Sequence, residues 1–265
     1  LTRAWRYAAR LGRPVDDVTR PGGIDTDAAR ALISGWMERS PEGRWLSDEE
    51  ATQLLECYGI SVAAFRTVTD ESDAVAAAEE LGGPVAVKAT GEQWRHRPDL
   101  SGVRLDVVGA GAVGRAYRDL FAVSGNPVMV VQRMATKGIG CVVRVQDDPS
   151  FGAVVSFGLS GALPDLLGDR AYRVLPLGAR DAAELIESPR SAPMLSGYRT
   201  ASPVNKNALI DLVLRVSTLA DDLPEVRHLI CDPVLASATG ADTTDARIRI
   251  GPEPMQADFG PRRLR

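Results

Sequence analysis

The segment from residue 70 to residue 88 constrains the fold of this chain more than any other. Asp70 leads into a stretch rich in Ala and Glu, which predicts a helix that runs to Leu81. The Gly-Gly-Pro sequence at 82–84 ends this helix, because glycine favours the turn and proline cannot continue it. The next residues are apolar and β-branched, so they predict a short buried strand that ends at Lys88.

Lys88 is a cation at the end of this predicted strand. Its aliphatic stem can lie in the core while its ammonium group reaches an edge. Lysine is also a compact point charge that suits phosphate. The alternative is a surface lysine that extends into solvent, which is the more common case for an isolated strand-end lysine. The motifs elsewhere in the chain favour phosphate binding.

Helical and strand patterns alternate along the rest of the chain. Ser47 and Glu50 form a capping box at the start of a predicted helix that ends at Gly59. Further predicted strands lie at 60–68, 102–107, 128–134, 141–145, 151–158, 229–235 and 247–250, and further helices at 113–123, 181–187 and 205–219. The first part therefore reads α-β-α-β-β-α, and the last two strands are expected to pair as a hairpin. This order predicts an α/β (α+β) fold.

Size and composition narrow the class of protein. The chain has 265 residues, of which 45% are apolar and 25% charged, and this is enough for one large or two small domains. A net charge of −4 argues against broad nucleic-acid binding, and no apolar run is long enough to cross a membrane. Cys57, Cys141 and Cys231 are far apart in the sequence and indicate no disulfide framework or zinc site. We therefore expect a cytoplasmic protein that binds neither nucleic acid nor membrane.

We expect four segments. Residues 1–44 are broken repeatedly by Pro and Gly and predict a linker from a missing upstream domain, with a short helix at 28–33 that Asp25 or Asp27 could cap. Residues 45–125 and 126–250 are the expected first and second subdomains, and residues 251–265 are expected to form a loose tail.

The run Gly109–Gly114 matches the G-x-G-x-x-G dinucleotide fingerprint. That fold requires a second parallel strand about twenty residues on, ending in an acidic residue. The next predicted strand, 128–134, ends in Gln-Arg-Met and has no carboxylate. A dinucleotide-dependent oxidoreductase is therefore the weaker hypothesis, and absence of NAD(H) binding would dismiss it.

Three other features suit phosphoryl transfer. The polar loop 90–102 contains His96, and the loop 157–161 has glycines that let backbone N–H groups approach phosphate oxygens. Asp232 and Asp245 lie in or beside the last two predicted strands. If these strands pair, the two carboxylates can share one Mg²⁺, which prefers hard oxygen ligands.

This order of motifs resembles the ATP-grasp domain of the NDP-forming acyl-CoA synthetases, the acetyl-CoA and succinyl-CoA synthetase family. The matching pieces are 54–60, 83–88, 96–103, 148–152, 157–161 with 166–169, 195–199, and 231–234 with 245–247. The resemblance covers residues 45 to 250 and implies an ATP-grasp fold, with two α/β subdomains and a nucleotide cleft between them.

The resemblance also implies an activity and a set of site residues. Such a module would convert ATP, a small carboxylic acid and CoA into ADP, phosphate and acyl-CoA through an acyl phosphate and a phosphohistidine. Upstream domains, in cis or in trans, would bind CoA and carry the first histidine. His96 would accept the phosphoryl group, and Asp232 and Asp245 would hold Mg²⁺. The implied nucleotide-binding residues are Lys88, Gln132, Arg133, Met134, Gly158, Ser160 and Gly161.

Some positions depart from the family pattern. Arg97-Pro98 stands where the family usually has Lys-Ser, and Gly140 stands where it usually has a glutamate. Ser160 interrupts the Gly-Leu-Gly-Gly loop, and Asp165 is the nearest substitute for a second glutamate.

Some single-chain bacterial members also carry a GNAT-type lysine acetyltransferase domain. The alternative function is therefore a degenerate ATP-grasp regulatory domain of a fused lysine acetyltransferase, which binds ligand without turnover.

Overall fold

A computed structural model of the chain describes residues 17–91, 94, 102–148, 151–199 and 202–252. The chain forms two compact units. Unit 1 comprises residues up to Ser61, Gly138–Ala241 and the residues from Asp245 onward, and unit 2 comprises Val62–Lys137 and Asp242–Thr244. The sequence analysis placed the main boundary near residue 125; the structure instead assigns helix α3 (Asp48–Cys57) to unit 1 and strand β5 (Met129–Arg133) to unit 2.

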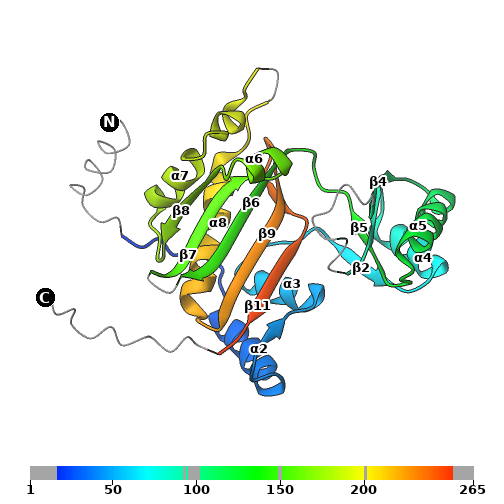
Figure 1. Ribbon diagram of the computed structural model, residues 1–265, viewed down its shortest axis with the longest axis horizontal. Coiled ribbons are helices and arrows are strands. Elements are labelled where there is room, and N and C mark those ends of the chain that lie inside the picture. The colour runs from blue at the N-terminus through cyan, green and yellow to red at the C-terminus, as the bar shows by residue number, and fades with distance from the viewer. Residues whose placement is uncertain (1–16, 92–93, 95–101, 149–150, 200–201, 253–265) are drawn as a thin grey trace, which may run out of the picture. The chain divides into compact units, whose positions relative to one another are not determined.

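Unit 2 is a four-stranded antiparallel sheet, within the described residues, with two helices packed on it (Figure 1). The strand order is β2-β5-β3-β4. The elements are β2 (Phe65–Val68), α4 (Glu71–Leu81), β3 (Val85–Ala89), β4 (Val103–Val107), α5 (Ala110–Ser124) and β5 (Met129–Arg133). Strands β4 and β5, which flank the glycine motif at 109–114, both pair antiparallel with β3, so they are not adjacent strands as in the dinucleotide-binding βαβ unit. Gly109 instead caps α5.

The predicted helix at 70–81 begins and ends as its sequence indicates. The Asp70 carboxylate accepts a hydrogen bond from the Asp73 N–H at 2.8 Å, and Gly82 ends the helix with φ = 68°. Val85 and Val87 of the following strand are fully buried. The local pattern therefore fixes where β3 begins and brings Lys88 to its fourth position.

Unit 1 is built on a seven-stranded sheet, within the described residues, in the order β1-β11-β9-β6-β7-β8, with β10 paired to β9. Its strands are β1 (Arg44–Trp45), β6 (Ile139–Asp148), β7 (Gly152–Leu159), β8 (Arg170–Val174), β9 (Val226–Ala236), β10 (Ala241–Thr243) and β11 (Ala246–Ile250). Its helices are α2 (Thr26–Arg39), α3 (Asp48–Cys57), α6 (Ala162–Leu166), α7 (Ala179–Glu187), α8 (Lys206–Asp222) and the 3₁₀ helix η2 (Ala192–Ser196). The pairing of β9 with β11 confirms the predicted hairpin.

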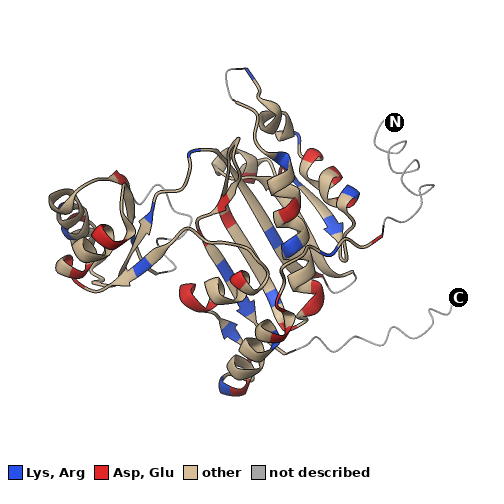
Figure 2. Cartoon of the chain, turned by 180° about the vertical axis from the view of Figure 1, so that it is seen from behind, with Lys and Arg blue, Asp and Glu red and all other residues tan. Residues whose placement is uncertain are grey.

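Helices α7 and α8 cover one face of this sheet (Figures 1 and 2). Side chains alternate along the strands, so Val143 and Val145 are buried beneath the helices. Arg144 points to the other side, in one row with Ile230 of β9 and Arg247 of β11. We refer to the face that carries Arg144, Ile230 and Arg247 as the open face.

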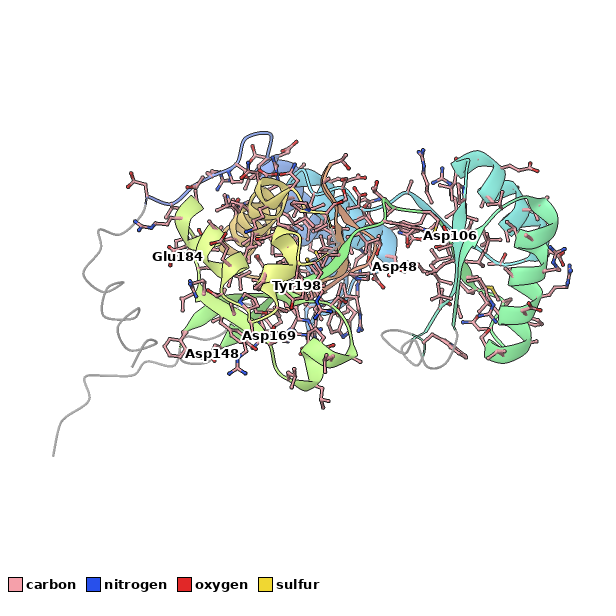
Figure 3. All side chains as sticks on the ribbon, turned by 90° about the horizontal axis from the view of Figure 1, so that it is seen from above. Asp48, Asp106, Asp148, Asp169, Glu184 and Tyr198 are labelled. Atoms are coloured by element: carbon pink, nitrogen blue, oxygen red, sulfur yellow. The ribbon has the colours of Figure 1, made fainter. Side chains whose placement is uncertain are left out.

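Two features of unit 1 differ from the sequence analysis. The short helix expected at 28–33 is the longer helix α2, capped by Asp25, and its Ala29, Ile33 and Trp36 are buried, so this part of the expected linker belongs to unit 1. Strand β8 lies in a stretch for which the sequence analysis predicts no element, although its Arg-Ala-Tyr-Arg-Val sequence alternates as a strand should. The Asp169 carboxylate, labelled in Figure 3, accepts hydrogen bonds from the N–H groups of Arg190 and Ser191 at 2.7 and 2.8 Å, which ties the segment before η2 to β8. Tertiary packing thus orders segments that look irregular in the sequence.

Candidate functional site

Lys88 lies in the middle of the unit 2 sheet, paired with Val103 of β4 and Val130 of β5. Its side chain is partly buried. The ammonium Nζ donates to the backbone carbonyl of Thr244 at 3.4 Å. Since Val85 and Val87 are buried on the core side, the lysine stem extends over the opposite side of the sheet and delivers its charge to Thr244.

Gln132 of β5 reaches the same carbonyl. Its Nε2 donates to the Thr244 oxygen at 3.0 Å and to the Ala63 oxygen at 2.9 Å. Gln132 is only 4% exposed, so its amide holds two backbone segments together inside unit 2. The structure thus brings two predicted nucleotide-binding residues together at Thr244. The sequence analysis missed Thr244, although its position just before Asp245 is a signal that could have singled it out.

The predicted base-binding residues Arg133 and Met134 are the last residue of β5 and the residue that follows it. The Arg133 N–H donates to the Ala64 carbonyl at 2.9 Å, and the Met134 N–H donates to the Pro84 carbonyl at 3.0 Å. The Arg133 side chain is exposed. These bonds fix the path of the backbone here and commit both N–H groups, so any contact of this segment with a ligand would use carbonyl oxygens or side chains.

Asp232 lies in β9, a central strand of the unit 1 sheet. Proline has no N–H and is tolerated in a central strand only at an irregularity. The register of β9 against β6 shifts at Asp232-Pro233, where the pairs Cys141–Val234 and Val143–Cys231 leave two residues of β9 opposite one of β6. Such a bulge can re-aim a side chain, and Asp232 is 8% exposed and hydrogen-bonded on the open face.

Both carboxylate oxygens of Asp232 have partners. The Ser160 hydroxyl donates to Oδ1 at 2.7 Å, and Arg144 Nη2 donates to Oδ2 at 3.2 Å. The sequence analysis predicted Ser160 and Asp232 as site residues and missed Arg144. An arginine in the middle of an apolar strand, Cys141–Val145, was the signal.

Asp232 lies in β9, and Asp245 lies immediately before the neighbouring strand β11. The Asp232 N–H donates to the Asp245 carbonyl at 3.1 Å, next to the Ala246–Cys231 pair. Two carboxylates are the type of ligand that a hard cation such as Mg²⁺ prefers. Within the described residues, no group of three or more His, Cys, Asp or Glu side chains could hold a metal. A metal here would therefore take these two residues, with its other ligands coming from nucleotide and water.

The predicted phosphate loop, 157–161, begins inside β7, so Gly158 is not a loop residue but lies in the sheet, paired with Val142 of β6 and Arg170 of β8. Gly158 is required by packing, because a Cβ there would lie 2.8 Å from the Asp169 carbonyl oxygen. Gly161 has φ = 124°, which disfavours any residue with a side chain. The Ser160 N–H donates to the Gly140 carbonyl at 2.8 Å. The backbone N–H of Ser160 is therefore already hydrogen-bonded within the protein, and its hydroxyl donates a hydrogen bond to Asp232.

The predicted phosphoryl acceptor, His96, lies outside the described residues, as do Arg97 and Pro98. The base of their loop is described. The Ala89 N–H donates to the Gly102 carbonyl at 2.8 Å, directly after Lys88. The loop that contains His96 therefore leaves the end of β3 and returns at the start of β4.

Comparison with known proteins identifies the family. A family model of the ATP-grasp domain matches residues 38–250, so the chain belongs to the ATP-grasp family. It is 33% identical to the beta subunit of ADP-forming acetate–CoA ligase I of Pyrococcus furiosus over 227 residues, which cover 83% of this chain and 97% of that protein. It is also 33% identical to ADP-forming acetate–CoA ligase II of Archaeoglobus fulgidus, of which it spans 30%. The fold class predicted from sequence is confirmed.

Solved structures agree. A dinucleotide-forming acetyl-coenzyme A synthetase 1 from Ca. Korarchaeum cryptofilum, in complex with coenzyme A and Ca-AMPCP, superimposes with a TM-score of 0.76 at 29% identity. The match covers 84% of this chain and 99% of that one. A second structure of that synthetase, with Mg-AMPPCP and a phosphohistidine segment pointing towards the nucleotide site, gives a TM-score of 0.71 at 30% identity.

Proposed function

We propose that this chain is the ATP-grasp module of an NDP-forming acyl-CoA synthetase. With upstream domains in cis or in trans, it would convert ATP, a small carboxylic acid and CoA into ADP, phosphate and acyl-CoA through an acyl phosphate and a phosphohistidine. The proposal is supported by the match along nearly the whole Pyrococcus beta subunit and by relatives that bind CoA and Mg-AMPPCP. The structural observation that carries it is the convergence of Lys88 and Gln132 on Thr244.

Each site residue has a proposed task. Lys88 places one positive charge for the nucleotide phosphates, and Gln132 holds the backbone at Thr244. Arg133 and Met134 border the base, and Gly158 of β7 with Ser160 and Gly161 just beyond that strand face the phosphates. Asp232 and Asp245 would hold Mg²⁺, which when bound neutralises phosphate charge. His96 would carry the phosphoryl group between the nucleotide and the histidine of the upstream domain.

Nucleotide binding tests the proposal directly. Lys88→Ala removes the phosphate cation, so we expect it to weaken Mg·ADP binding at least tenfold, an effect of about 1.4 kcal/mol or more. Isothermal titration calorimetry on the purified chain measures this affinity. Lys206→Ala is the matched control, since Lys206 pairs with Glu187 on unit 1 and has no proposed role. Absence of binding to the unmodified chain at millimolar ADP would contradict the proposed function.

A second candidate function is a degenerate ATP-grasp domain that regulates a fused lysine acetyltransferase. Gly140 favours it, because the family glutamate is absent and Ser160 occupies the adjacent space, with its Cβ 3.3 Å from where a Gly140 Cβ would stand. In the full-length protein, phosphate on His96 during turnover rules this candidate out. Nucleotide binding without phosphorylation of His96 supports it.

We also place the protein in a reducing cytoplasm. All three cysteines are free, and burial raises the pKa of the Cys141 and Cys231 thiols to about 12. Both thiols are therefore protonated and unreactive at neutral pH. Among the described residues, no helix has the length and apolar character to cross a membrane.

A further inference from the structure

Arg144 is a charged residue in a strand that is otherwise part of the core. Its neighbours Val143 and Val145 are 0% and 1% exposed. Arg144 lies on the open face, and its side chain is 31% exposed. Neither the sequence analysis nor the proposed function gives this residue a task.

The guanidinium of Arg144 occupies one side of the carboxylate that would hold a metal. Its Nη2 lies 3.2 Å from Asp232 Oδ2, and the Asp232 side chain is 9% exposed. Oppositely charged groups interact more strongly when one of them is removed from water. A divalent cation that approaches Asp232 therefore meets a carboxylate that is already neutralised by a positive charge.

The hold of Arg144 on Asp232 is incomplete. The Arg144 Nε is buried and has no hydrogen-bond partner among the described residues. A buried donor without an acceptor is unfavourable. Because the side chain is partly exposed, the guanidinium has a path to water, where all of its donors can be hydrated. Arg144 can therefore leave Asp232 for water at a low energetic cost.

Two departures from the family pattern meet at the same place. Gly140 replaces a glutamate, and Ser160 replaces a loop glycine. The Ser160 Cβ stands 3.3 Å from where a Gly140 Cβ would be, so the smaller residue at 140 accommodates the larger one at 160. The Ser160 hydroxyl then donates to Asp232. These changes remove one negative charge near Asp232 and add a donor to it, which also lowers its attraction for a metal.

We infer that Arg144 competes with divalent metal for the Asp232 carboxylate and that metal binding displaces it. This inference rests on the proposed function for the identity of the metal site. Arg144 would thus lower the affinity of the site for a divalent metal, because it neutralises the Asp232 carboxylate.

Mn²⁺ binding without nucleotide tests the inference. Arg144→Gln removes the competing charge, so we expect Mn²⁺ to bind about tenfold more tightly, which corresponds to about 1.4 kcal/mol. Free Mn²⁺ is measured by electron paramagnetic resonance. Arg249→Gln, on the same face of β11 two residues beyond Arg247, is the matched control and leaves Mn²⁺ affinity unchanged. Arg144→Lys keeps the charge and is expected to bind Mn²⁺ as weakly as the unmodified chain.

Folding is monitored in the same proteins by thermal unfolding. Arg144→Gln leaves Asp232 with an uncompensated charge, so Mn²⁺ should raise its melting temperature more than that of the unmodified chain. Equal Mn²⁺ affinity in the unmodified chain and Arg144→Gln, or no Mn²⁺ binding by either, would overturn the inference. Tighter Mn²⁺ binding by Arg144→Gln together with a failure to bind ADP would leave the inference standing and remove the proposed function.

Discussion

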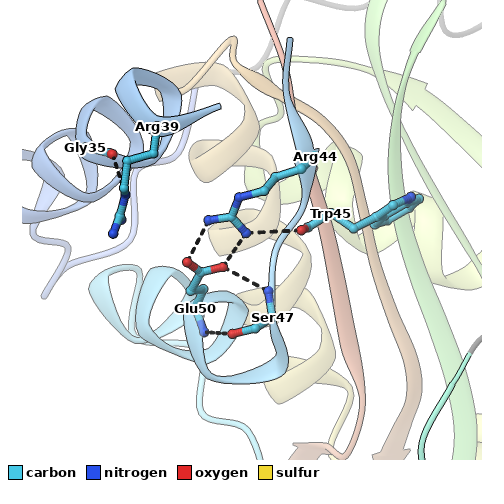
Figure 4. Close-up of polar contacts among 6 residues, drawn as sticks. All are labelled: Gly35, Arg39, Arg44, Trp45, Ser47 and Glu50. Carbon is cyan, nitrogen blue, oxygen red and sulfur yellow. Dashed lines mark hydrogen bonds and ion pairs between the residues drawn. The ribbon is translucent and has the colours of Figure 1, made fainter. Parts of the chain in front are cut away.

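At the scale of single residues, the ion pairs of this chain differ in what they contribute. Arg44 and Glu50 form a two-pronged pair, with Nη1–Oε2 and Nη2–Oε1 distances of 2.6 and 2.7 Å (Figure 4). Glu50 also accepts from the Ser47 N–H, and the Ser47 hydroxyl accepts from the Glu50 N–H. One carboxylate therefore serves both the capping box of α3 and the attachment of β1 to that helix.

The pKa of Glu50 gives this pair a pH dependence. Hydrogen bonds from Arg44 hold the pKa below its usual value. Because the folded-state pKa is depressed, the stabilisation is present above the unfolded value of about 4.3 and is lost as pH falls through the folded value. Glu50→Gln keeps the capping box and loses the pair, which we expect to cost about 1 kcal/mol at pH 7.

Thermal unfolding at pH 7 and below pH 4 measures this effect. The difference in stability between the unmodified chain and Glu50→Gln should shrink as the pH falls. Glu56→Gln, exposed on the same helix, provides the control. A difference that is the same at both pH values would show that the charge of Glu50 is not what stabilises the helix.

At the scale of elements, α2 shows how a segment with linker-like composition becomes part of a domain. Asp25 caps the helix by accepting from the Ala28 N–H at 3.0 Å, and its own N–H donates to the Cys57 carbonyl at the end of α3 at 2.8 Å. The Trp36 side chain is 4% exposed. The family match also begins inside this helix, at residue 38.

Truncation of Trp36 tests whether α2 is integral to unit 1. Trp36→Ala should destabilise the protein by about 3–5 kcal/mol, because it removes a large buried side chain and leaves a cavity. Urea unfolding followed by circular dichroism measures the loss. Glu38→Ala, exposed on the same helix, should change stability by less than about 0.5 kcal/mol. If both variants unfold alike, α2 contributes nothing to the domain.

At the scale of the whole molecule, residues 62–137, together with residues 242–244, form a second unit that has its own hydrophobic core. That core includes Leu120 of α5, Val87 of β3 and Met129 of β5, all at most 1% exposed. The unit 1 core is separate and includes Leu209 of α8, which is fully buried. Each unit can therefore lose stability through its own core.

Hydrogen exchange of paired variants tests this division. Leu120→Ala should cost about 2–5 kcal/mol and speed amide exchange in β2, β3 and β5 while leaving α8 unchanged. Leu209→Ala should give the reverse pattern. Mass spectrometry of peptic fragments reads both regions. Faster exchange throughout the chain in both variants would show that the two units unfold together.

The sequence by itself determined the local structure and the order of motifs. Caps, glycines and periodicity fixed α3, α4 and α5, and they placed Lys88 within β3 and Asp232 within β9, because these signals act over a few residues. Only the tertiary structure decided which distant residues meet. The contacts of Arg144 with Asp232, of Ser160 with Gly140, and of Lys88 with Thr244 depend on strand register and on a bulge. Register depends on which faces of the paired strands become buried and on the turns between them, so it is decided only when segments far apart in the chain pack together.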